Sequence, residues 1–142
     1  MTISAILDTK GHEVVSIAIG ARVSDALTIL ASRKIGALPV MDGDTVAGIF
    51  SERDVIEGLG REGATILDKP VDAAMSSPVI TVTREISILS ALAMMTQQRI
   101  RHLPVVEDGR LIGIVSIGDL VKMRIDRIEQ EARAMRDYIQ SA

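Results

Sequence analysis

The chain has 142 residues and a formal net charge of −3, which suits one compact folding unit and argues against a general attraction to nucleic acid or anionic lipid. Apolar residues make up 47% of it but aromatic residues only 1%, so the core must be aliphatic, and the stacking faces that single-stranded nucleic acids use are missing. There is no cysteine, which excludes disulfides, thiolate metal sites and a cysteine nucleophile, and no window approaches the roughly 18 apolar residues of a membrane span. We therefore expect a cytoplasmic protein that contacts neither nucleic acid nor membrane.

The first half of the chain predicts a strand, a helix and a hairpin, in that order. Branched residues favour a strand over Val14 to Ile19. From Val23 to Lys34, the residues of one stripe recur at intervals of three or four, which predicts an amphipathic helix. Two short strands, at 38–41 and 46–50, flank the turn signal Asp42-Gly43 and predict a hairpin.

A second helix beginning at Ser51 ends this half, and a linker from Arg61 to Ser77 follows. The linker contains a short helical patch, Val71 to Met75, whose position resembles that of an N-terminal patch at Ile3 to Leu7. The segment Gly58 to Gly63 fits the dinucleotide pattern G-x-G-x-x-G, but it neither leaves a strand nor opens a helix. We interpret these glycines as the end of the helix.

The second half repeats the first at an offset of 65 residues (104 − 39 = 65), because Leu38-Pro39-Val40 recurs as Leu103-Pro104-Val105. The repeat predicts a strand over Val79 to Val82, a helix from Ile88 to Arg99 and a hairpin at Asp108-Gly109. Ser87 is a plausible N-cap of that helix, whereas its counterpart Arg22 is not. The other identities are Ala26 with Ala91, Leu27 with Leu92, Ile35 with Ile100, Gly48 with Gly113, Ile49 with Ile114, Ser51 with Ser116, and Asp54 with Asp119.

The C-terminal segment from Asp119 to Ala142 lacks Gly and Pro and predicts a long helix. One apolar row along it has the alternating spacing of four and three that is typical of heptads. This row either covers the protein's own sheet or forms a dimer seam, and the sequence leaves both roles open. Its members are Val121, Ile125, Ile128, Ala132, Met135 and Ile139.

The repeated Ser-x-x-Asp segments carry the chemistry that we consider functional. Ser51 and Ser116 lie where a strand turns into a helix, so their hydroxyls and the free amides of the first turn can face a phosphate. Asp54 and Asp119 follow on the same rim, where a carboxylate can accept hydrogen bonds from two ribose hydroxyls. The same spacing is close to a capping box, which would only satisfy backbone amides and stabilise the helix by roughly 1 kcal/mol.

At 48–54 and 113–119, each preceded by a Leu-Pro-Val strand, the sequence resembles the CBS domain family. The resemblance covers nearly the whole chain and implies a tandem CBS pair, or Bateman module, of the α/β class. Two β-α-β-β-α units would pack through their sheets, with motif 1 at 1–64, motif 2 at 65–126 and a C-terminal helix extension at 127–142. Pairs of this family bind adenosine derivatives such as AMP, ADP, ATP, NAD(H) or S-adenosylmethionine, and they generally associate into dimers of four motifs.

The resemblance also implies residue roles: Ser51 and Ser116 for phosphate or ribose, Asp54 and Asp119 for ribose. It implies further contacts from the backbone near Val15 and Ile80 and from the segment before each Leu-Pro-Val, which is Gly36-Ala37 in copy one and Arg101-His102 in copy two. Only copy two has donors suited to phosphate there, so two occupied clefts should differ in affinity or ligand. A solvated strand edge is the alternative role for Arg101 and His102. Arg53, whose counterpart is a glycine, is a further candidate.

The function that follows is a regulatory module that senses AMP, ADP, ATP or NADH and transmits binding to an unidentified protein by a change of conformation or assembly. A homodimer is expected, and no catalytic cofactor, metal or catalytic residue is. His12 and His102 show no metal-ligand spacing, and neither a phosphate-loop motif nor a G-x-S-x-G elbow occurs. The alternative is a structural or oligomerisation module with vestigial clefts.

Overall fold

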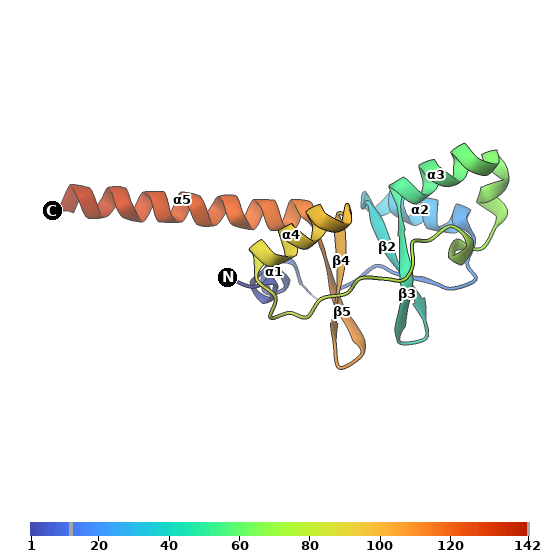
Figure 1. Cartoon of the computed structure of the whole chain (residues 1–142), viewed down its shortest axis with the longest axis horizontal. Helices are drawn as coiled ribbons and strands as arrows, with labels where there is room; N and C mark the ends of the chain where they lie inside the picture. Colours follow the sequence, from blue (N-terminus) through green and yellow to red (C-terminus); the bar gives the residue numbers. More distant parts are fainter. Residues whose placement is uncertain (12, 142) are drawn as a thin grey trace.

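A computed structural model describes residues 1–11 and 13–141 of the chain (Figure 1). The elements of its first half are α1 (Ile3–Lys10), β1 (Ile17–Ala18), α2 (Val23–Arg33), β2 (Ala37–Asp42), β3 (Thr45–Ser51) and α3 (Glu52–Glu62). Two short 3-10 helices follow, η1 (Gly63–Asp68) and η2 (Val71–Ala73), and then α4 (Ile88–Gln98), β4 (His102–Glu107), β5 (Arg110–Ser116) and α5 (Ile117–Ser141). The α/β class and the two repeated units predicted from the sequence are confirmed.

The two hairpins have the same register in both copies. Val40 of β2 lies opposite Gly48 of β3, and Val105 of β4 lies opposite Gly113 of β5, each pair displaced by the repeat offset. The second turn is at Asp108-Gly109 as predicted, but the first is at Gly43-Asp44, one residue later than predicted, because Asp42 still pairs with Thr45. Gly43 has φ 62°, which suits the first central position of a two-residue hairpin turn.

Helices α2 and α4 end one residue before the predicted stripes end. Lys34 and Arg99 are their C-caps, with φ 54° and 55° in the left-handed region, so these two residues lie outside the helices. The predicted N-cap of α4 is confirmed, because the Ser87 hydroxyl accepts a hydrogen bond from the backbone N–H of Ser90 at 3.0 Å. The C-caps of α2 and α4 therefore place a basic residue at the same point of each unit.

The predicted first strand of each unit was too long. Within 14–19 only β1 pairs, lying parallel to β2, and within 79–82 only Val82 forms a parallel bridge, to Val105. Val79 and Ile80 line a cavity between the hairpins instead of joining a sheet. These segments lie at the edges of small sheets, where few backbone hydrogen bonds to a neighbouring strand hold them. Side-chain packing therefore determines the course of the chain there.

Each unit has its own core, which is aliphatic except for the fully buried Phe50 in the first unit. Each core is completed by a segment that the repeat does not assign to that unit. α1 packs Ile3, Ile6 and Leu7 into the core of the second unit, while the linker packs Ile66 and Val71 into the core of the first. The division of the sequence at residue 64 thus does not coincide with packing. The closing segments pack directly against the glycine of each second hairpin strand, because a glycine has no side chain in the way. A Cβ at Gly113 would lie 2.5 Å from Leu7 Cδ2, and one at Gly48 would lie 2.7 Å from Met75 Sδ.

The two hairpins stand next to each other, with β3 and β5 in contact and the helices of each unit on the outer sides (Figure 1). α5 leaves this body and continues away from it, so that the C-terminal end lies far from both hairpins (Figure 1). In the part of the chain that the structure describes, no helix is both long and apolar enough to cross a membrane.

Candidate functional site

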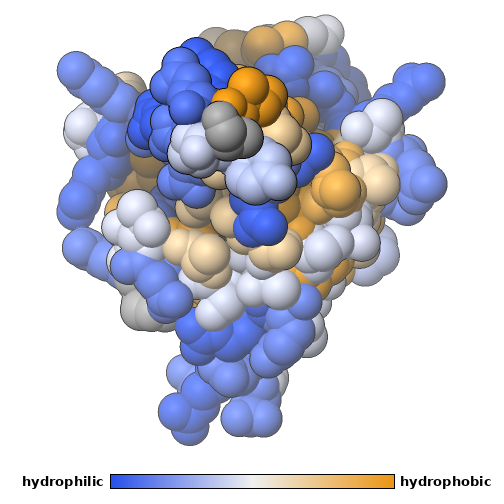
Figure 2. Space-filling view, turned by 90° about the vertical axis from the view of Figure 1, so that its left-hand side faces the viewer, coloured by the Kyte–Doolittle hydropathy of each residue, from blue (hydrophilic) through white to orange (hydrophobic). Residues whose placement is uncertain are grey.

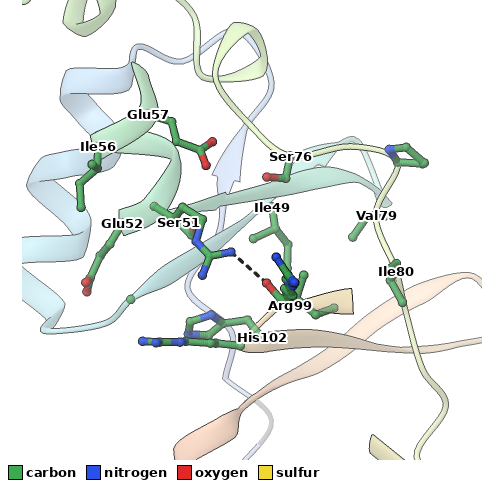
Figure 3. A pocket seen from close by; sticks show the side chains of 15 residues that line it. Ile49, Ser51, Glu52, Ile56, Glu57, Ser76, Val79, Ile80, Arg99 and His102 are labelled. Carbon is green, nitrogen blue, oxygen red and sulfur yellow. Dashed lines mark hydrogen bonds between the residues drawn. The ribbon is translucent and has the colours of Figure 1, made fainter. Parts of the chain in front are cut away.

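A cavity of about 700 Å³ lies between the two units (Figure 3). We call it the shared cleft, because residues of both repeats line it. Six of the residues expected to bind ligand are in its lining, namely Gly36, Ser51, Arg53, Ile80, Arg101 and His102. The sequence prediction assigned Gly36 and Arg101-His102 to separate clefts, whereas the side-by-side hairpins bring them into one.

The two units come close together at Gly36, on one wall of the cleft. A Cβ at that position would lie 3.3 Å from Cε1 of His102 and 3.4 Å from Oε1 of Glu52. Any larger residue would therefore push its side chain into the mouth of the cleft or against the imidazole. The glycine keeps this wall of the cleft as bare backbone.

Ser51 and Asp54 cap α3, and Ser51 is also part of the polar lining of the shared cleft. Asp54 Oδ2 accepts the Ser51 backbone N–H at 2.9 Å, and the Asp54 backbone N–H donates to Ser51 Oγ at 3.4 Å, which is the reciprocal cap that the spacing allowed. The Ser51 hydroxyl also lies 3.1 Å from Asp54 Oδ2 and can donate to it. Asp54 Oδ1 accepts the hydroxyl of Ser76 at 2.8 Å. Asp54 is only 6% exposed and lies behind Ser51 and Ser76, which line the cleft. A sugar hydroxyl can reach this carboxylate only by replacing the Ser76 hydroxyl.

Three guanidinium groups surround the opening of the cleft. Arg53, at the start of α3, donates from Nη1 to the backbone oxygen of Arg99 at 3.0 Å and so joins the two units (Figure 3). Arg99 and Arg101 are exposed and come from the second unit. Together with the carboxylates of Glu52 and Glu57 they give the lining a net positive charge, which suits a phosphate-bearing ligand.

His102 lies half-buried at the junction of the two units. Burial is the main cause that lowers the pKa of its imidazole below the ordinary value, and the nearby Lys10 charge acts in the same direction. The carboxylates of Asp119 and Glu52 oppose this shift but do not reverse it. The ring is therefore neutral at pH 7 and can gain a proton when an anion enters the cleft.

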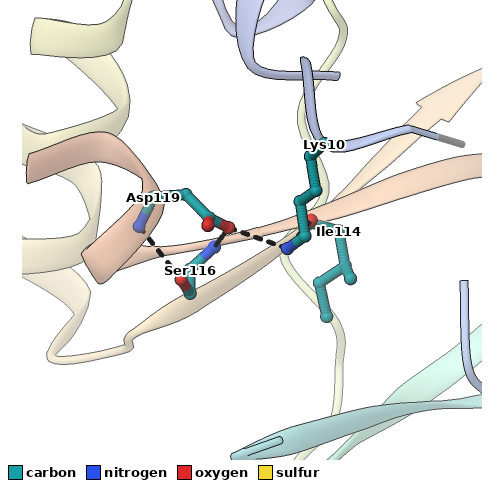
Figure 4. A network of polar contacts seen from close by, with 4 residues as sticks. All are labelled: Lys10, Ile114, Ser116 and Asp119. Carbon is teal, nitrogen blue, oxygen red and sulfur yellow. Dashed lines mark hydrogen bonds and ion pairs between the residues drawn. The ribbon is translucent and has the colours of Figure 1, made fainter. Parts of the chain in front are cut away.

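The equivalent site of the second unit is occupied by a side chain of the protein itself (Figure 4). Ser116 and Asp119 repeat the cap, with hydrogen bonds of 2.9 Å and 3.1 Å between them. Lys10 at the end of α1 donates to Asp119 Oδ2 at 2.8 Å and to the Ile114 backbone oxygen at 3.0 Å. Burial alone would raise the pKa of Asp119, but the hydrogen bond and charge of Lys10, with the backbone donation from Ser116, hold that pKa below its ordinary value.

Five of the residues expected to bind ligand are not in the lining of the shared cleft. Asp54 lies directly behind it, and Ser116 and Asp119 are in the site closed by Lys10. Val15 packs against the first core, and Ala37 is buried with 5% exposure at the start of β2. His12, discounted above as a metal ligand, lies outside the described residues. Among the residues that are described, no group of three or more His, Cys, Asp or Glu side chains is placed to hold a metal ion.

Sequence reasoning missed two polar residues that matter for the cleft, Ser76 and Arg99. Ser76 lies in the linker, where no repeat signal exists, because the segment that occupies the equivalent place in the second unit is α1. Arg99 did carry a signal, since a basic residue recurs at Lys34 and Arg99. Their spacing places both in the helical stripes, so the pattern alone predicts helix residues and not a cleft contact.

Comparison with known proteins gives one consistent family. A family model described as CBS domain matches residues 5–61 and 71–126. The chain is 36% identical over 123 residues to the mitochondrial CBS domain-containing protein CBSX3 of Arabidopsis thaliana, with 83% of this chain covered, and it spans 60% of the length of that protein. It is 30% identical over 120 residues to the CBS domain-containing protein YhcV of Bacillus subtilis, covering 82% of this chain and 83% of YhcV.

Solved structures agree with this result. The CBS-domain containing protein ATU1752 of Agrobacterium tumefaciens matches with a TM-score of 0.85 and 38% identity, over 87% of this chain and 99% of that one. The CBS domain pair of protein MJ0100, solved in complex with 5-methylthioadenosine and S-adenosyl-L-methionine, matches with a TM-score of 0.79 over 89% of this chain and 98% of that one. At 22% identity this second likeness shows the fold alone.

Proposed function

The chain belongs to the CBS domain family, and we propose that its two CBS motifs form a regulatory module that binds one adenosyl ligand in the shared cleft. AMP, ADP, ATP and NAD(H) are the ligands that we consider. The observation that carries the proposal is the composition of the shared cleft, in which a helix start from one motif faces the arginines of the other. A helix start with hydroxyls suits a sugar or phosphate, and guanidinium groups suit a phosphate.

Binding to an adenosyl ligand is supported by a structural neighbour. The MJ0100 pair was solved with two adenosyl compounds, 5-methylthioadenosine and S-adenosyl-L-methionine. Both of those ligands lack a phosphate, whereas the shared cleft is lined by Arg53, Arg99 and Arg101. The excess of cationic groups favours a phosphorylated adenosyl ligand over one that carries a sulfonium charge.

Occupancy of one cleft per chain is the second part of the proposal. In the first unit, Asp54 is held by the neutral hydroxyls of Ser51 and Ser76, which a ligand can replace. In the second unit, Asp119 is held by the ammonium group of Lys10, which also bonds to a backbone oxygen. A ribose hydroxyl is a weaker partner for a carboxylate than an ammonium group, so the second site stays closed.

The role that we propose is regulatory and not catalytic. The arginines of one unit and the helix start of the other meet across the boundary between the units, so a ligand there contacts both units and can bias their relative orientation. A homodimer and a cytoplasmic location are parts of the same proposal. A structural module with vestigial clefts is the alternative, because the observed caps by themselves explain the Ser-x-x-Asp spacing.

Calorimetric titration with AMP, ADP, ATP, NADH and S-adenosylmethionine separates these functions. The repeat supplies a matched pair of variants, Asp54→Ala and Asp119→Ala, which remove the same cap from α3 and from α5. We expect Asp54→Ala to weaken ligand binding at least tenfold, since a hydrogen bond to a charged group is worth about 1.5 to 3 kcal/mol. We expect the same loss from Arg101→Ala, which removes an exposed guanidinium group from the cleft lining. We expect Asp119→Ala to leave binding nearly unchanged. No heat for any of the five ligands would favour the structural alternative, and equal losses for both aspartates would overturn the single-cleft proposal.

A further inference from the structure

The long helix α5 has an apolar face that the body of the protein does not cover. Its 25 residues span about 37 Å at about 1.5 Å per residue. Near its start, Leu120 is fully buried and Met123 packs against the second core. From Ile125 to Ser141 every side chain is exposed, and the helix stands clear of both units (Figure 1).

A helical segment of this length without tertiary contacts is only marginally stable in water, because most helices gain their stability by packing an apolar face. The ion pair between Arg127 and Glu131 at 3.1 Å adds a few tenths of a kcal/mol. That is too little to hold the free part of α5 as a helix. The segment therefore needs a partner that buries its apolar row.

The exposed apolar row is regular along the whole helix. Its spacing of four and three residues averages 3.5, which keeps one seam on one side of a supercoiled pair. Ile125 and Ile128 are 49% and 48% exposed, and Met135 and Ile139 are 60% and 64% exposed. At about 100° per residue, the row lies roughly a quarter turn away from Leu120, which faces the body, so a second helix has access to it. Figure 2, which looks along α5 from its C-terminal end, shows orange apolar surface beside blue charged side chains.

The charges beside the row decide which partner fits and in which direction. With Ile125, Ala132 and Ile139 at heptad position a and Val121, Ile128 and Met135 at position d, the flanking g and e positions carry opposite charges at the spacing of a parallel pair. Arg124 then meets Glu129 of a second copy, and Glu131 meets Arg136 of a second copy. Both contacts occur twice because the two helices are identical.

The antiparallel arrangement that stacks the same apolar layers has like charges in contact. It would place Glu129 opposite Glu129 of the second copy and Lys122 opposite Arg136 of the second copy. The apolar row can pack in either direction, but the like charges on its flanks disfavour the antiparallel pair.

We propose that α5 forms a parallel, in-register, two-stranded coiled coil with α5 of a second copy of this chain. The seam begins at Val121 and ends at Ile139. It places the bodies of the two copies at the same end of the coiled coil. Nothing in this proposal depends on ligand binding. A monomeric chain would therefore remove the homodimer from the proposed function but leave its ligand-binding part to the calorimetric test.

Sedimentation equilibrium on the full chain tests the seam. The test variant is Ile128→Glu at position d, and the matched control is Ala134→Glu on the opposite side of the same exposed segment. Both residues lie outside either core, so neither change should unfold the body. We expect the wild type and Ala134→Glu to be dimers over the micromolar range and Ile128→Glu to raise the dimer Kd at least a hundredfold. A wild type that stays monomeric, or an Ile128→Glu variant with unchanged association, overturns the proposal.

The direction of the helices needs a second measurement. Because the chain has no cysteine, Ile139→Cys introduces a single thiol, and in a parallel pair the two thiols lie next to each other. We expect a covalent dimer to form readily in a glutathione redox buffer. An antiparallel pair would bring residue 139 next to Val121 and give no such product, which would contradict the parallel assignment. The charge variant Arg136→Glu should weaken the dimer, and the double variant Glu131→Arg with Arg136→Glu should restore it.

Discussion

Replacing Lys10 by alanine is the most informative single change, because it opens the second site without touching either core. In the wild type, Lys10 Nζ donates to Asp119 Oδ2 at 2.8 Å and to the Ile114 backbone oxygen at 3.0 Å. Lys10 is the last residue of α1, and alanine is a good helix former, so α1 keeps its packing in Lys10→Ala. The change removes an ammonium group and leaves the Asp119 carboxylate partly buried.

The cost in stability follows from the exposure of the two groups. The Lys10 and Asp119 side chains are 41% and 27% exposed, so solvent screens the pair, and such pairs contribute about 0.2 to 1 kcal/mol. The hydrogen bond to Ile114 adds about 0.5 kcal/mol. We expect Lys10→Ala to lower the free energy of unfolding by about 1 kcal/mol, which lowers Tm by about 4 °C for a chain of this size.

The pH dependence has a definite sign. The pKa of Asp119 in the folded protein is below its ordinary value of 3.8, so the stabilising effect of the Lys10 pair is complete above that pH and is lost as the pH falls through the folded pKa. In Lys10→Ala, burial should raise the pKa of Asp119. Urea unfolding of both proteins should therefore differ at pH 7, and the difference should shrink in acid and in 1 M salt.

NMR titration of Asp119 gives its pKa directly, and a double-mutant cycle with Asp119→Asn isolates the pair. With the ammonium group gone, calorimetry should also detect a second, weaker binding event per chain. The reasoning is refuted if Lys10→Ala leaves both the stability and the pKa of Asp119 as they are in the wild type.

Three further changes test other parts of the structure. Gly36→Val should reduce ligand affinity at least tenfold, because the new side chain fills the cleft beside His102, while the free energy of unfolding should change by less than about 1 kcal/mol. Unchanged affinity would show that the ligand binds outside the shared cleft. Leu7→Ala should lower the free energy of unfolding in urea by about 3 kcal/mol, because Leu7 is fully buried in the second core. The control Leu59→Ala, at a site 40% exposed, should lower it by under about 1 kcal/mol, and equal losses would contradict the packing of α1. Burial holds the pKa of His102 below its ordinary value, and a bound anion would raise it, so affinity should increase as the pH is lowered in the wild type and much less in His102→Gln. Parallel pH profiles would exclude a role for this ring.

The repeat in the sequence accounts for much of the fold. Identical positions such as Gly48 and Gly113 predicted two hairpins with the same register, and Ser87 predicted a helix start. These features are local, since they depend on turns, caps and periodicity within a few residues of each other. The long helix α5 was predictable for the same reason.

The arrangement of the sites was not predictable from the repeat. Whether Arg101 lines its own unit's cleft or the other's depends on how two hairpins pack, which no local pattern encodes. The closing segments differ for a similar reason, because the helix α1 and the linker around Ser76 share no sequence yet cover equivalent places. The closed second site follows from this difference, since Lys10 has no counterpart in the linker that could bond to Asp54.

A crystal structure of the full chain with the ligand that binds most tightly in calorimetry tests the central claim most directly. We expect one molecule per chain between the two motifs, with its sugar beside Ser51 and its phosphate beside Arg101. A ligand bound at Asp119, with the space between Ser51 and Arg101 left empty, would contradict the account.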